Sequence, residues 1–374
     1  MEDTTNIYFF PVGNGDMTLI KLRSGRTILI DINIRQLTGD DPPPDVAKEL
    51  KELLSEDALG RPFVDAFLLS HPDQDHCRGL EEHFYLGDPA SRPSAEKKIF
   101  IRELWSSPRT FRRHSKNHTL CPDAKAFAAE GRRRVKEYRA GKSDDGNRIK
   151  LMGHDVDGKT DDIASIVVEV GAEFSSIAGV NDSDFKAKLL GPWKPDDGEE
   201  ENFTKNNNSV ILSIQLGAQG NADACKFLTG GDAEVSVWEK LWSRAKDDLE
   251  YDLLQAPHHC SWHSLSSDSW SKSKSPKVSA DAKSALSQTR PGAFVVASSN
   301  KIEDDDNDPP CIGAKREYTK IVSAVSGEFV CVGDPKVSKA RVFEVFRDGP
   351  RLTPLRTTAA SGGGVIGTVP LQHG

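Results

Sequence analysis

Four side chains that can bind metal ions follow a short apolar run, Phe67-Leu68-Leu69. They are His71, Asp73, Asp75 and His76. Imidazole and carboxylate groups are ligands for zinc, manganese and iron. Residues 65–69 read as a buried strand of a layered α/β protein, so the four side chains would lie on a loop at its carboxyl end. The alternative is a plain turn, in which proline and aspartate only shape the backbone.

The spacing His-x-Asp-x-Asp-His resembles the metallo-β-lactamase superfamily, and in particular the hydrolase domain of the ComEC competence proteins. Four further blocks are similar to that domain and occur in the same order. They are Pro-Val-Gly-Asn-Gly-Asp at 11–16, Asn-Asn-Ser-Val-Ile-Leu at 207–212, Thr-Gly-Gly-Asp at 229–232 and Ala-Pro-His-His-Cys-Ser at 256–261. The blocks span residues 7–300, so the resemblance covers most of the chain. It implies an α/β fold, the αββα metallo-β-lactamase sandwich, with an inserted helical and loop region.

In that fold, loops at the strand ends meet at one edge and hold two metal ions. The resemblance implies seven ligands: His71, Asp73, Asp75, His76, Asp232, His258 and His259. The first two would bind one ion, the next two would bind the other, and Asp232 would bridge them. Either His258 or His259 would complete the second group, and the sequence leaves open which one.

The resemblance also implies roles for residues around the ions. Asp16, Asp31 and Asn208 are expected to orient the ligands. The common superfamily pattern has a further histidine where this chain has Asn207, Asn208 or Ser209. Without that histidine the first ion would have more oxygen ligands, which favours Mn²⁺ over Zn²⁺. We therefore expect two divalent ions, Mn²⁺ or Zn²⁺, as cofactors.

Three residues are predicted to act in catalysis: Asp75, His259 and Ser261. Asp75 would orient the attacking water while binding a metal ion. The histidine that is not a ligand would donate a proton to the leaving group. Ser261 would donate a hydrogen bond to a substrate oxygen.

The composition indicates a protein without a membrane segment. Hydrophobic residues make up 37% of the 374 residues, and no run approaches the roughly 18 apolar residues that span a bilayer. The first residues are polar and do not resemble a signal peptide. Six scattered cysteines without a Cys-x-x-Cys pair indicate a reducing compartment. We therefore expect a cytoplasmic protein with no membrane partner.

One basic stretch interrupts an otherwise acidic chain, whose net charge is -8. Residues 109–139 hold ten Lys or Arg and three acidic residues. This stretch could follow the phosphates of a nucleic acid, or it could be a solvated helix face. The candidate nucleic-acid contacts are Arg112, Arg113, Arg132, Arg133 and Arg134.

The chain is expected to form a single hydrolase domain over residues 1–355. Residues 85–185 would be an irregular basic region inserted within it, and residues 356–374 would be a flexible tail. A helix is expected over 77–84, with its N-terminus facing the metal loop. The apolar segment 341–346 is expected to close the second sheet.

These observations predict a metal-dependent hydrolase, above all a phosphodiesterase or nuclease that acts on DNA or RNA. The alternative is a hydrolase of a small molecule such as a cyclic nucleotide, a lactone or a thioester, because one fold supports many reactions. A third possibility is a binding module without catalysis. The lack of a membrane channel also suggests a regulatory protein partner in bacterial defence.

Overall fold

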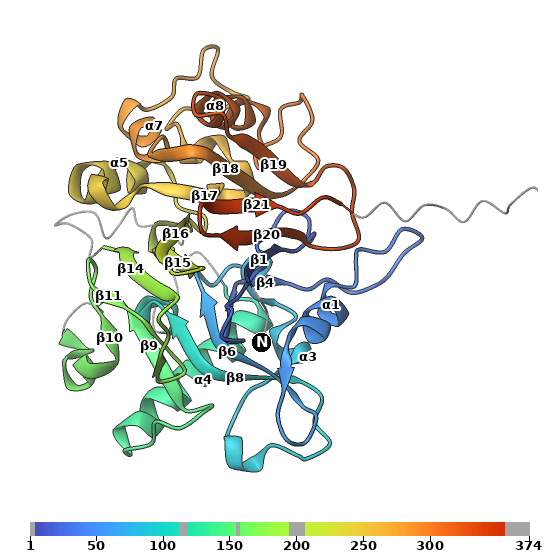
Figure 1. Ribbon diagram of the computed structural model, residues 1–374, viewed down its shortest axis with the longest axis vertical. Helices are drawn as coiled ribbons and strands as arrows, with labels where there is room; N and C mark the ends of the chain where they lie inside the picture. The colour runs from blue at the N-terminus through green and yellow to red at the C-terminus, as the bar shows by residue number, and fades with distance from the viewer. Residues whose placement is uncertain (1–3, 112–118, 155–157, 194–205, 356–374) are drawn as a thin grey trace, which may run out of the picture.

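The computed structural model describes residues 4–111, 119–154, 158–193 and 206–355 (Figure 1). Within these ranges two large β-sheets pack face to face, and helices cover the outer face of each. The layers run helix, sheet, sheet, helix. This order is the αββα metallo-β-lactamase sandwich that the motifs predict. The predicted tail, 356–374, lies outside the described residues.

The first sheet contains β1 Thr5–Phe9, β2 Thr18–Lys21, β3 Thr27–Ile30, β6 Pro62–Leu69, β8 Ile99–Ser106, β9 Arg148–Met152, β10 Val167–Val168, β20 Arg341–Phe346 and β21 Gly349–Leu352. Its strand order is β10-β9-β8-β6-β3-β2-β1-β20-β21, and the short β5 Ser55–Glu56 and β7 Phe84–Tyr85 pair with β6 and β8. Strands β3, β6, β8 and β9 are parallel. Their carboxyl ends therefore lie at one edge of the sheet.

The second sheet contains, in spatial order, β11 Glu173–Phe174, β14 Phe185–Gly191, β15 Ile211–Ala218, β16 Asn221–Leu228, β17 Tyr251–Gln255, β18 Thr289–Asn300 and β19 Glu328–Gly333. The last four are parallel to one another. Short strands outside the two sheets are β4 Ile32–Asn33, β12 Ser176–Ile177 and β13 Val180–Asn181. The loops that leave β16 and β17 thus emerge at the same edge of this sheet.

Helices α1 Val46–Leu53, α2 Gln74–Cys77, α3 Leu80–His83 and α4 Pro122–Arg139 cover the first sheet. Helices α5 Val235–Ala245, α7 Ala280–Leu286 and α8 Ile312–Ser323 cover the second (upper half of Figure 1). The turn α6 Pro257–Cys260 follows β17. Short 3-10 turns are η1 Pro89–Ser91, η2 Pro108–Phe111, η4 Asp161–Ile166, η6 Asn206–Asn208, η7 Lys246–Asp248 and η8 Trp262–Ser264. In the described part of the chain, no helix is both long enough and apolar enough to cross a membrane.

Successive side chains of a strand point to opposite faces of its sheet, so the buried apolar residues form three layers. On β6, Leu68 joins the core between the two sheets, while Phe67 and Leu69 join the core beneath the helices of the first sheet. Phe67 packs edge to face on Phe127 of α4, with ring centroids 5.9 Å apart. Trp238 of α5 is buried in the outer core of the second sheet. Each such large apolar side chain contributes about 1.5–3 kcal/mol on burial, which fixes the strands that carry the site loops.

Three expectations about the chain's organisation are wrong. Residues 85–185 are not an insertion, because they supply β8 and β9 to the first sheet and α4 to its helical layer. Segment 341–346 pairs with β1 in the first sheet, not in the second. The helix expected over 77–84 is interrupted, because Arg78 leaves the helical conformation at the end of α2 and Gly79, with φ of +90°, precedes α3.

Candidate metal centre

Three loops meet where the carboxyl edges of the two sheets face each other. One follows β6 and carries His71 and the start of α2, the second follows β16 and carries Asp232, and the third is α6 after β17. Backbone hydrogen bonds join the loops. The N–H of Val210 donates to the oxygen of Ser70 at 3.0 Å, and the N–H of His258 donates to the oxygen of Gly231 at 2.9 Å.

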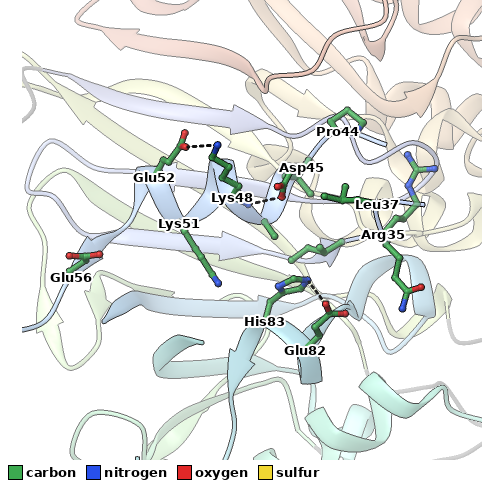
Figure 2. A pocket seen from close by; sticks show the side chains of 14 residues that line it. Arg35, Leu37, Pro44, Asp45, Lys48, Lys51, Glu52, Glu56, Glu82 and His83 are labelled. Atoms are coloured by element: carbon green, nitrogen blue, oxygen red, sulfur yellow. Dashed lines mark hydrogen bonds and ion pairs between the residues drawn. The ribbon is translucent and has the colours of Figure 1, made fainter. Parts of the chain in front are cut away.

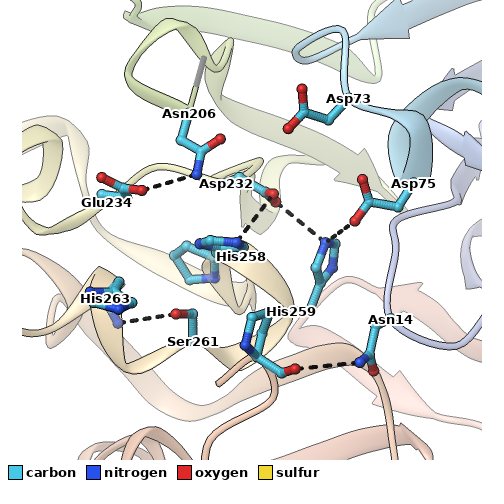
Figure 3. A network of polar contacts seen from close by, with 12 residues as sticks. Asn14, Asp73, Asp75, Asn206, Asp232, Glu234, His258, His259, Ser261 and His263 are labelled. Atoms are coloured by element: carbon cyan, nitrogen blue, oxygen red, sulfur yellow. Dashed lines mark hydrogen bonds and ion pairs between the residues drawn. The ribbon is translucent and has the colours of Figure 1, made fainter. Parts of the chain in front are cut away.

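The buried carboxylate of Asp232 faces imidazoles on both of its oxygens (Figure 3). Oδ2 lies 3.4 Å from Nε2 of His71 and 3.6 Å from Nε2 of His258. Oδ1 lies 3.0 Å from Nε2 of His76 and 3.5 Å from Nε2 of His259. The two adjacent histidines of α6 therefore face different oxygens of one carboxylate.

A second carboxylate adjoins each pair of imidazoles. Oδ2 of Asp73 lies 3.9 Å from Nε2 of His71, and Oδ2 of Asp75 lies 3.3 Å from Nε2 of His259. The seven predicted ligands thus come together as two groups of two imidazoles and one carboxylate, with Asp232 between the groups. The structure places His258 with the first group and His259 with the second.

The donor atoms of this cluster fit divalent metal ions. Within the described residues, Nε2 of His71, His76 and His259 is buried and makes no hydrogen bond. Single ligand atoms of Asp16, His76, Asp232 and His259 lie within 4.8 Å of one another. A cluster of Asp and His side chains that could hold a metal is therefore present, with the mixed nitrogen and oxygen ligands that suit zinc or manganese.

Asp31 contacts His76 directly and is linked to His71 through Ser70. Its Oδ2 lies 2.8 Å from Nδ1 of His76 and accepts a hydrogen bond from the Ser70 hydroxyl at 2.6 Å. The Ser70 oxygen in turn lies 3.0 Å from Nδ1 of His71. With a proton on each Nδ1, both Nε2 atoms keep a lone pair toward Asp232. Asp31 is thus placed to orient His76 directly and His71 through Ser70.

Asp16 approaches His76 and His259 from the side away from Asp232. Its Oδ1 lies 3.4 Å from Nδ1 of His259, and its Oδ2 lies 3.8 Å from Nδ1 of His76. Because these contacts use Nδ1, we assign Asp16 to the support of the imidazoles rather than to direct metal binding. The Asp16 N–H donates to the Asp75 backbone oxygen at 3.2 Å, which ties the loop before β2 to α2.

The α6 turn adopts an uncommon backbone conformation. His258, His259 and Cys260 have φ values of +51°, +53° and +70°, in the left-handed region. This region costs a residue with a side chain about 1–2 kcal/mol. Asp31 is in the same region, with φ of +54°. Strain of this kind persists only where surrounding contacts impose it, and it here turns two consecutive imidazoles toward the same carboxylate.

Opposite charges stabilise each other in this buried cluster. Burial acts to raise the pKa of Asp232, but the imidazoles of His76 and His259 lower it well below its usual value. Burial acts to lower the pKa of both histidines, yet the nearby carboxylates raise that of His76 well above its usual value and that of His259 to about 10. Protons on the imidazoles balance the carboxylates in the absence of metal, and metal ions would take over that role.

Asn208, the third predicted orienting residue, lies beside Arg109. Its Oδ1 accepts a hydrogen bond from Nη1 of Arg109 at 2.6 Å. The neighbouring Ser209 contacts the cluster directly, because its Oγ accepts the Asp232 N–H at 3.1 Å. The superfamily has a histidine at this place in the chain. Here His258 approaches the first group from the opposite loop and supplies an imidazole instead. The first group thus contains two imidazoles, His71 and His258, where the sequence predicted mainly oxygen ligands.

Two of the three catalytic assignments do not fit the geometry. Ser261 is fully buried, and its hydroxyl donates to Oδ1 of Asp308 at 2.6 Å while its oxygen caps the turn η8. It faces away from any substrate. His259 is buried against Asp232, Asp75 and Asp16, so it cannot reach a leaving group. Asp75 keeps its predicted place at the cluster.

The predicted nucleic-acid contacts on α4 are largely structural. Arg134 is 1% exposed and donates to Oε1 of Glu130 at 2.7 Å and to the Ile101 backbone oxygen at 3.0 Å. Arg133 donates to the same Glu130 and to Oδ1 of Asn147 at 2.7 Å. A guanidinium committed to such internal contacts is not available to a phosphate. The assignment of both residues to nucleic-acid binding is therefore wrong.

Arg132 donates from Nη1 to the Phe111 backbone oxygen at 2.8 Å, so it secures η2 against α4. Arg112 and Arg113 lie outside the described residues.

A cavity of about 690 Å³ beside α1 is separate from this cluster (Figure 2). Arg35, Lys51 and His83 are among its lining residues, and none of the seven candidate ligands lines it. Charges of both signs surround it, including the Lys48–Glu52 ion pair. Among the described residues, its acidic and histidine side chains do not form a group that could hold a metal ion.

Two residues near the cluster were missed by sequence reasoning. Ser70 links Asp31 to His71, and its signal is a polar residue at the end of an apolar strand, directly before a candidate ligand. Arg109 is buried in η2, just after β8, next to Asn208. The sequence does not distinguish it from the other basic residues of the stretch 109–139. Strand ends point to residues like these more reliably than charge density does.

No family model matches the chain, and no curated protein matches its sequence. Among solved structures, unliganded yeast PDE1 is similar with a TM-score of 0.42 and 13% identity, over 88% of this chain and 98% of that chain. A mutant of the CmlA beta-hydroxylase has a TM-score of 0.38 and 12% identity, over 92% of this chain and 54% of that chain. At these values neither likeness assigns an activity or a substrate to this chain.

Proposed function

We propose that this protein is a hydrolase that uses two divalent metal ions, Mn²⁺ or Zn²⁺, to cleave phosphodiester bonds in a nucleic acid or nucleotide. The observation that carries the proposal is the position of Asp232. Its two oxygens face two separate groups of ligands, one with His71 and His258 and the other with His76 and His259. A carboxylate shared in this way suits a bridge between two ions.

When bound, two divalent ions would supply an acidified water and positive charge for displacement at phosphorus. The chain's own residues hold and orient them. His71, Asp73 and His258 would hold one ion, and the group around Asp75 would hold the other. Asp31 and Asp16 keep the Nδ1 side of the imidazoles occupied, so that Nε2 is the ligand atom.

Exposure indicates the side from which a substrate approaches. The side chain of Asp75 is 36% exposed and that of His258 is 18% exposed, whereas His76 is fully buried. A substrate would therefore approach from the side of Asp75, whose partly exposed carboxylate could accept a hydrogen bond from the attacking water. The other side chains of the cluster are buried and exclude bulk water, which strengthens electrostatic interactions with a phosphoryl group.

The resemblance of the five motif blocks to the ComEC hydrolase domain supports a phosphodiester substrate over other esters. A second candidate is hydrolysis of a small nucleotide, such as a cyclic nucleotide. It is favoured by the internal commitment of Arg133 and Arg134, which removes part of the basic surface that a polymer would need.

The proposal is tested by a cleavage assay on the purified protein. Single-stranded DNA, duplex DNA, RNA, a cyclic dinucleotide and a generic phosphodiester are each incubated with Mn²⁺, Zn²⁺ or Mg²⁺. We expect metal-dependent cleavage that falls by more than about 100-fold in Asp75→Asn, because that change weakens a ligand and the water's orientation.

The matched control is Asp306→Asn, which removes a carboxylate from an exposed loop and should cleave normally. Cleavage of the small substrates alone would favour the second candidate. Protein that contains two ions per chain and cleaves none of these substrates would refute a phosphodiesterase.

A further inference from the structure

We propose that Cys121 and Cys77 form an oxidation site. A hydroperoxide reacts with Cys121, and Cys77 then closes a disulfide that displaces the metal-binding turn α2. The two sulfur atoms lie 3.6 Å apart, although the residues are 44 positions apart in the sequence. Cys77 directly follows His76, one of the candidate ligands.

Cys121 has the environment of a reactive thiol. Among the six cysteines, all within the described ranges, it is the only one that is not buried. It is the N-cap of α4, an 18-residue helix, and its sulfur accepts the Ala124 N–H at 3.4 Å. Backbone N–H groups and the positive end of a helix stabilise a thiolate.

The hydrogen bond from Cys77 lowers the pKa of Cys121 to about 6, with help from the Ala124 N–H and against the effect of burial. Burial also raises the pKa of Cys225, Cys260 and Cys311. Accessibility and thiolate character therefore select Cys121 as the site of attack, because the thiolate is the nucleophile.

The chemistry proceeds in two balanced steps. The Cys121 thiolate attacks one oxygen of hydrogen peroxide, the O–O bond breaks, and the departing hydroxide takes a proton from solvent. This step oxidises the sulfur to a sulfenic acid and reduces the peroxide to water. The Cys77 sulfur then attacks the sulfenic sulfur, the S–O bond breaks, and hydroxide leaves as water with the Cys77 proton.

Closure of this disulfide must move α2. The sulfur atoms have to approach by about 1.5 Å to reach a bond length of about 2.05 Å. Helix α4 is long and anchored in the core by Phe127, whereas α2 has four residues. The Cys77 sulfur also lies 3.1 Å from the Asp73 backbone oxygen, to which its single S–H can donate in place of Cys121, and oxidation removes this donor.

The N-terminus of α4 already holds the segment that follows α2. The carboxylate of Asp123 accepts the N–H of Gly79 at 3.0 Å and the N–H of Glu81 at 2.9 Å. Movement of Cys77 toward Cys121 is therefore taken up by the residues before Gly79, which include His76 and Asp75. We expect the ion held by these two residues to bind more weakly after oxidation. This consequence rests on the proposed metal centre, whereas formation of the disulfide does not.

The first test treats the metal-free protein with a small excess of hydrogen peroxide and maps disulfides by mass spectrometry after proteolysis. We expect a Cys77–Cys121 linkage, with the other four cysteines still reduced. In Cys77→Ser, which lacks the second thiol, dimedone should label a sulfenic acid at Cys121. Cys121→Ser keeps a good helix cap and should form neither product. Oxidation of any other cysteine first would overturn the proposal.

The second test repeats the treatment with metal-loaded protein and follows release of the ion with a chromophoric chelator. We expect release from the wild-type protein, reversal by dithiothreitol, and no release from Cys121→Ser. The control is Cys331→Ser, which changes a thiol in the second sheet and should behave like wild type. A mapped disulfide without release would refute the link to the metal centre, and a failure to load metal would instead count against the proposed function.

Discussion

The carboxylate of Asp31 lies 2.8 Å from Nδ1 of His76. It also accepts the N–H and the hydroxyl of Ser70, at 2.7 Å and 2.6 Å, and the same hydroxyl contacts His71. One buried carboxylate is thus linked to an imidazole in each ligand group, to Nδ1 of His76 directly and to Nδ1 of His71 through Ser70. Asp31 reaches this position in a left-handed backbone conformation, which is energetically unfavourable.

Asp31→Asn should weaken metal binding without unfolding the protein. The amide cannot accept both the Ser70 hydroxyl and the His76 N–H as a carboxylate does, so both imidazoles lose orientation. We expect a loss of about 10–100-fold in metal affinity, the range found for residues that orient ligands. Competition with a chromophoric chelator measures it.

The matched control is Asp65→Asn, a buried carboxylate at the other end of the same strand pair. Asp65 accepts the Thr27 N–H at 2.9 Å and pairs with Arg102, far along β6 from His71. It should lower stability and leave metal affinity unchanged. Equal losses of affinity in both variants would show that Asp31 acts only through stability.

His258→Ala and His259→Ala should each remove one metal ion. Nε2 of His258 faces Oδ2 of Asp232 and Nε2 of His259 faces Oδ1, so each variant leaves the other ligand group intact. Elemental analysis after dialysis should give about one ion per chain for each variant and two for the wild type. A variant that retains both ions would identify its histidine as a residue outside the ligand set.

Gly15→Ala should disrupt the loop that carries Asp16. A Cβ at Gly15 would clash with the Asn33 side chain and lie 2.8 Å from the Asp75 backbone oxygen. We expect a loss of about 1–3 kcal/mol in unfolding free energy from overpacking, together with lower activity. Gly25→Ala, at φ +85° with no atom within 4 Å, isolates the backbone cost and should keep full activity.

Ser261→Ala should reduce stability more than activity. The hydroxyl donates to Asp308 and its oxygen caps η8, and neither contact involves a candidate ligand. We expect a loss of about 1–2 kcal/mol in unfolding free energy and little change in kcat. Chemical denaturation and steady-state kinetics on the same preparation separate the two effects. Loss of activity at full stability would restore Ser261 to the catalytic set.

The rate at which Cys121 is alkylated should depend on pH as expected for a thiol with a low pKa. Since the thiolate reacts, the rate with iodoacetamide should rise with pH, reach half its maximum near pH 6, and be almost constant above pH 7. Cys77→Ala removes the hydrogen bond that lowers this pKa, and the midpoint should then move toward about 8.5, the value of an ordinary thiol. A midpoint that does not move would assign the shift to the helix alone.

Local patterns were sufficient for most of the individual elements. The strand expected over 65–69, which carries the metal-binding motif at its end, is found at Pro62–Leu69. Periodicity and capping act over a few residues, so the sequence carries them directly. Pairing partners are long-range choices, which is why segment 341–346 was expected in the wrong sheet.

The basic stretch, residues 109–139, shows a second limit of prediction from the sequence. Charge density along the chain reports how many guanidinium groups are present and not where they point. Arg134 is directed inward to backbone oxygens of β8 and β9 because α4 packs on that face. Only the contacts of the folded chain reveal that these charges are already used.

The sequence by itself determined the chemistry available at this site. Histidines and aspartates at the ends of apolar strands predict metal ligands, because parallel strands in a sandwich bring their carboxyl ends together. The tertiary structure decided how those ligands are divided. His258 and His259 are neighbours in sequence, and only the left-handed turn held between two loops directs them to opposite oxygens of Asp232. Such a backbone is imposed by the packing around it, so no local pattern could reveal it.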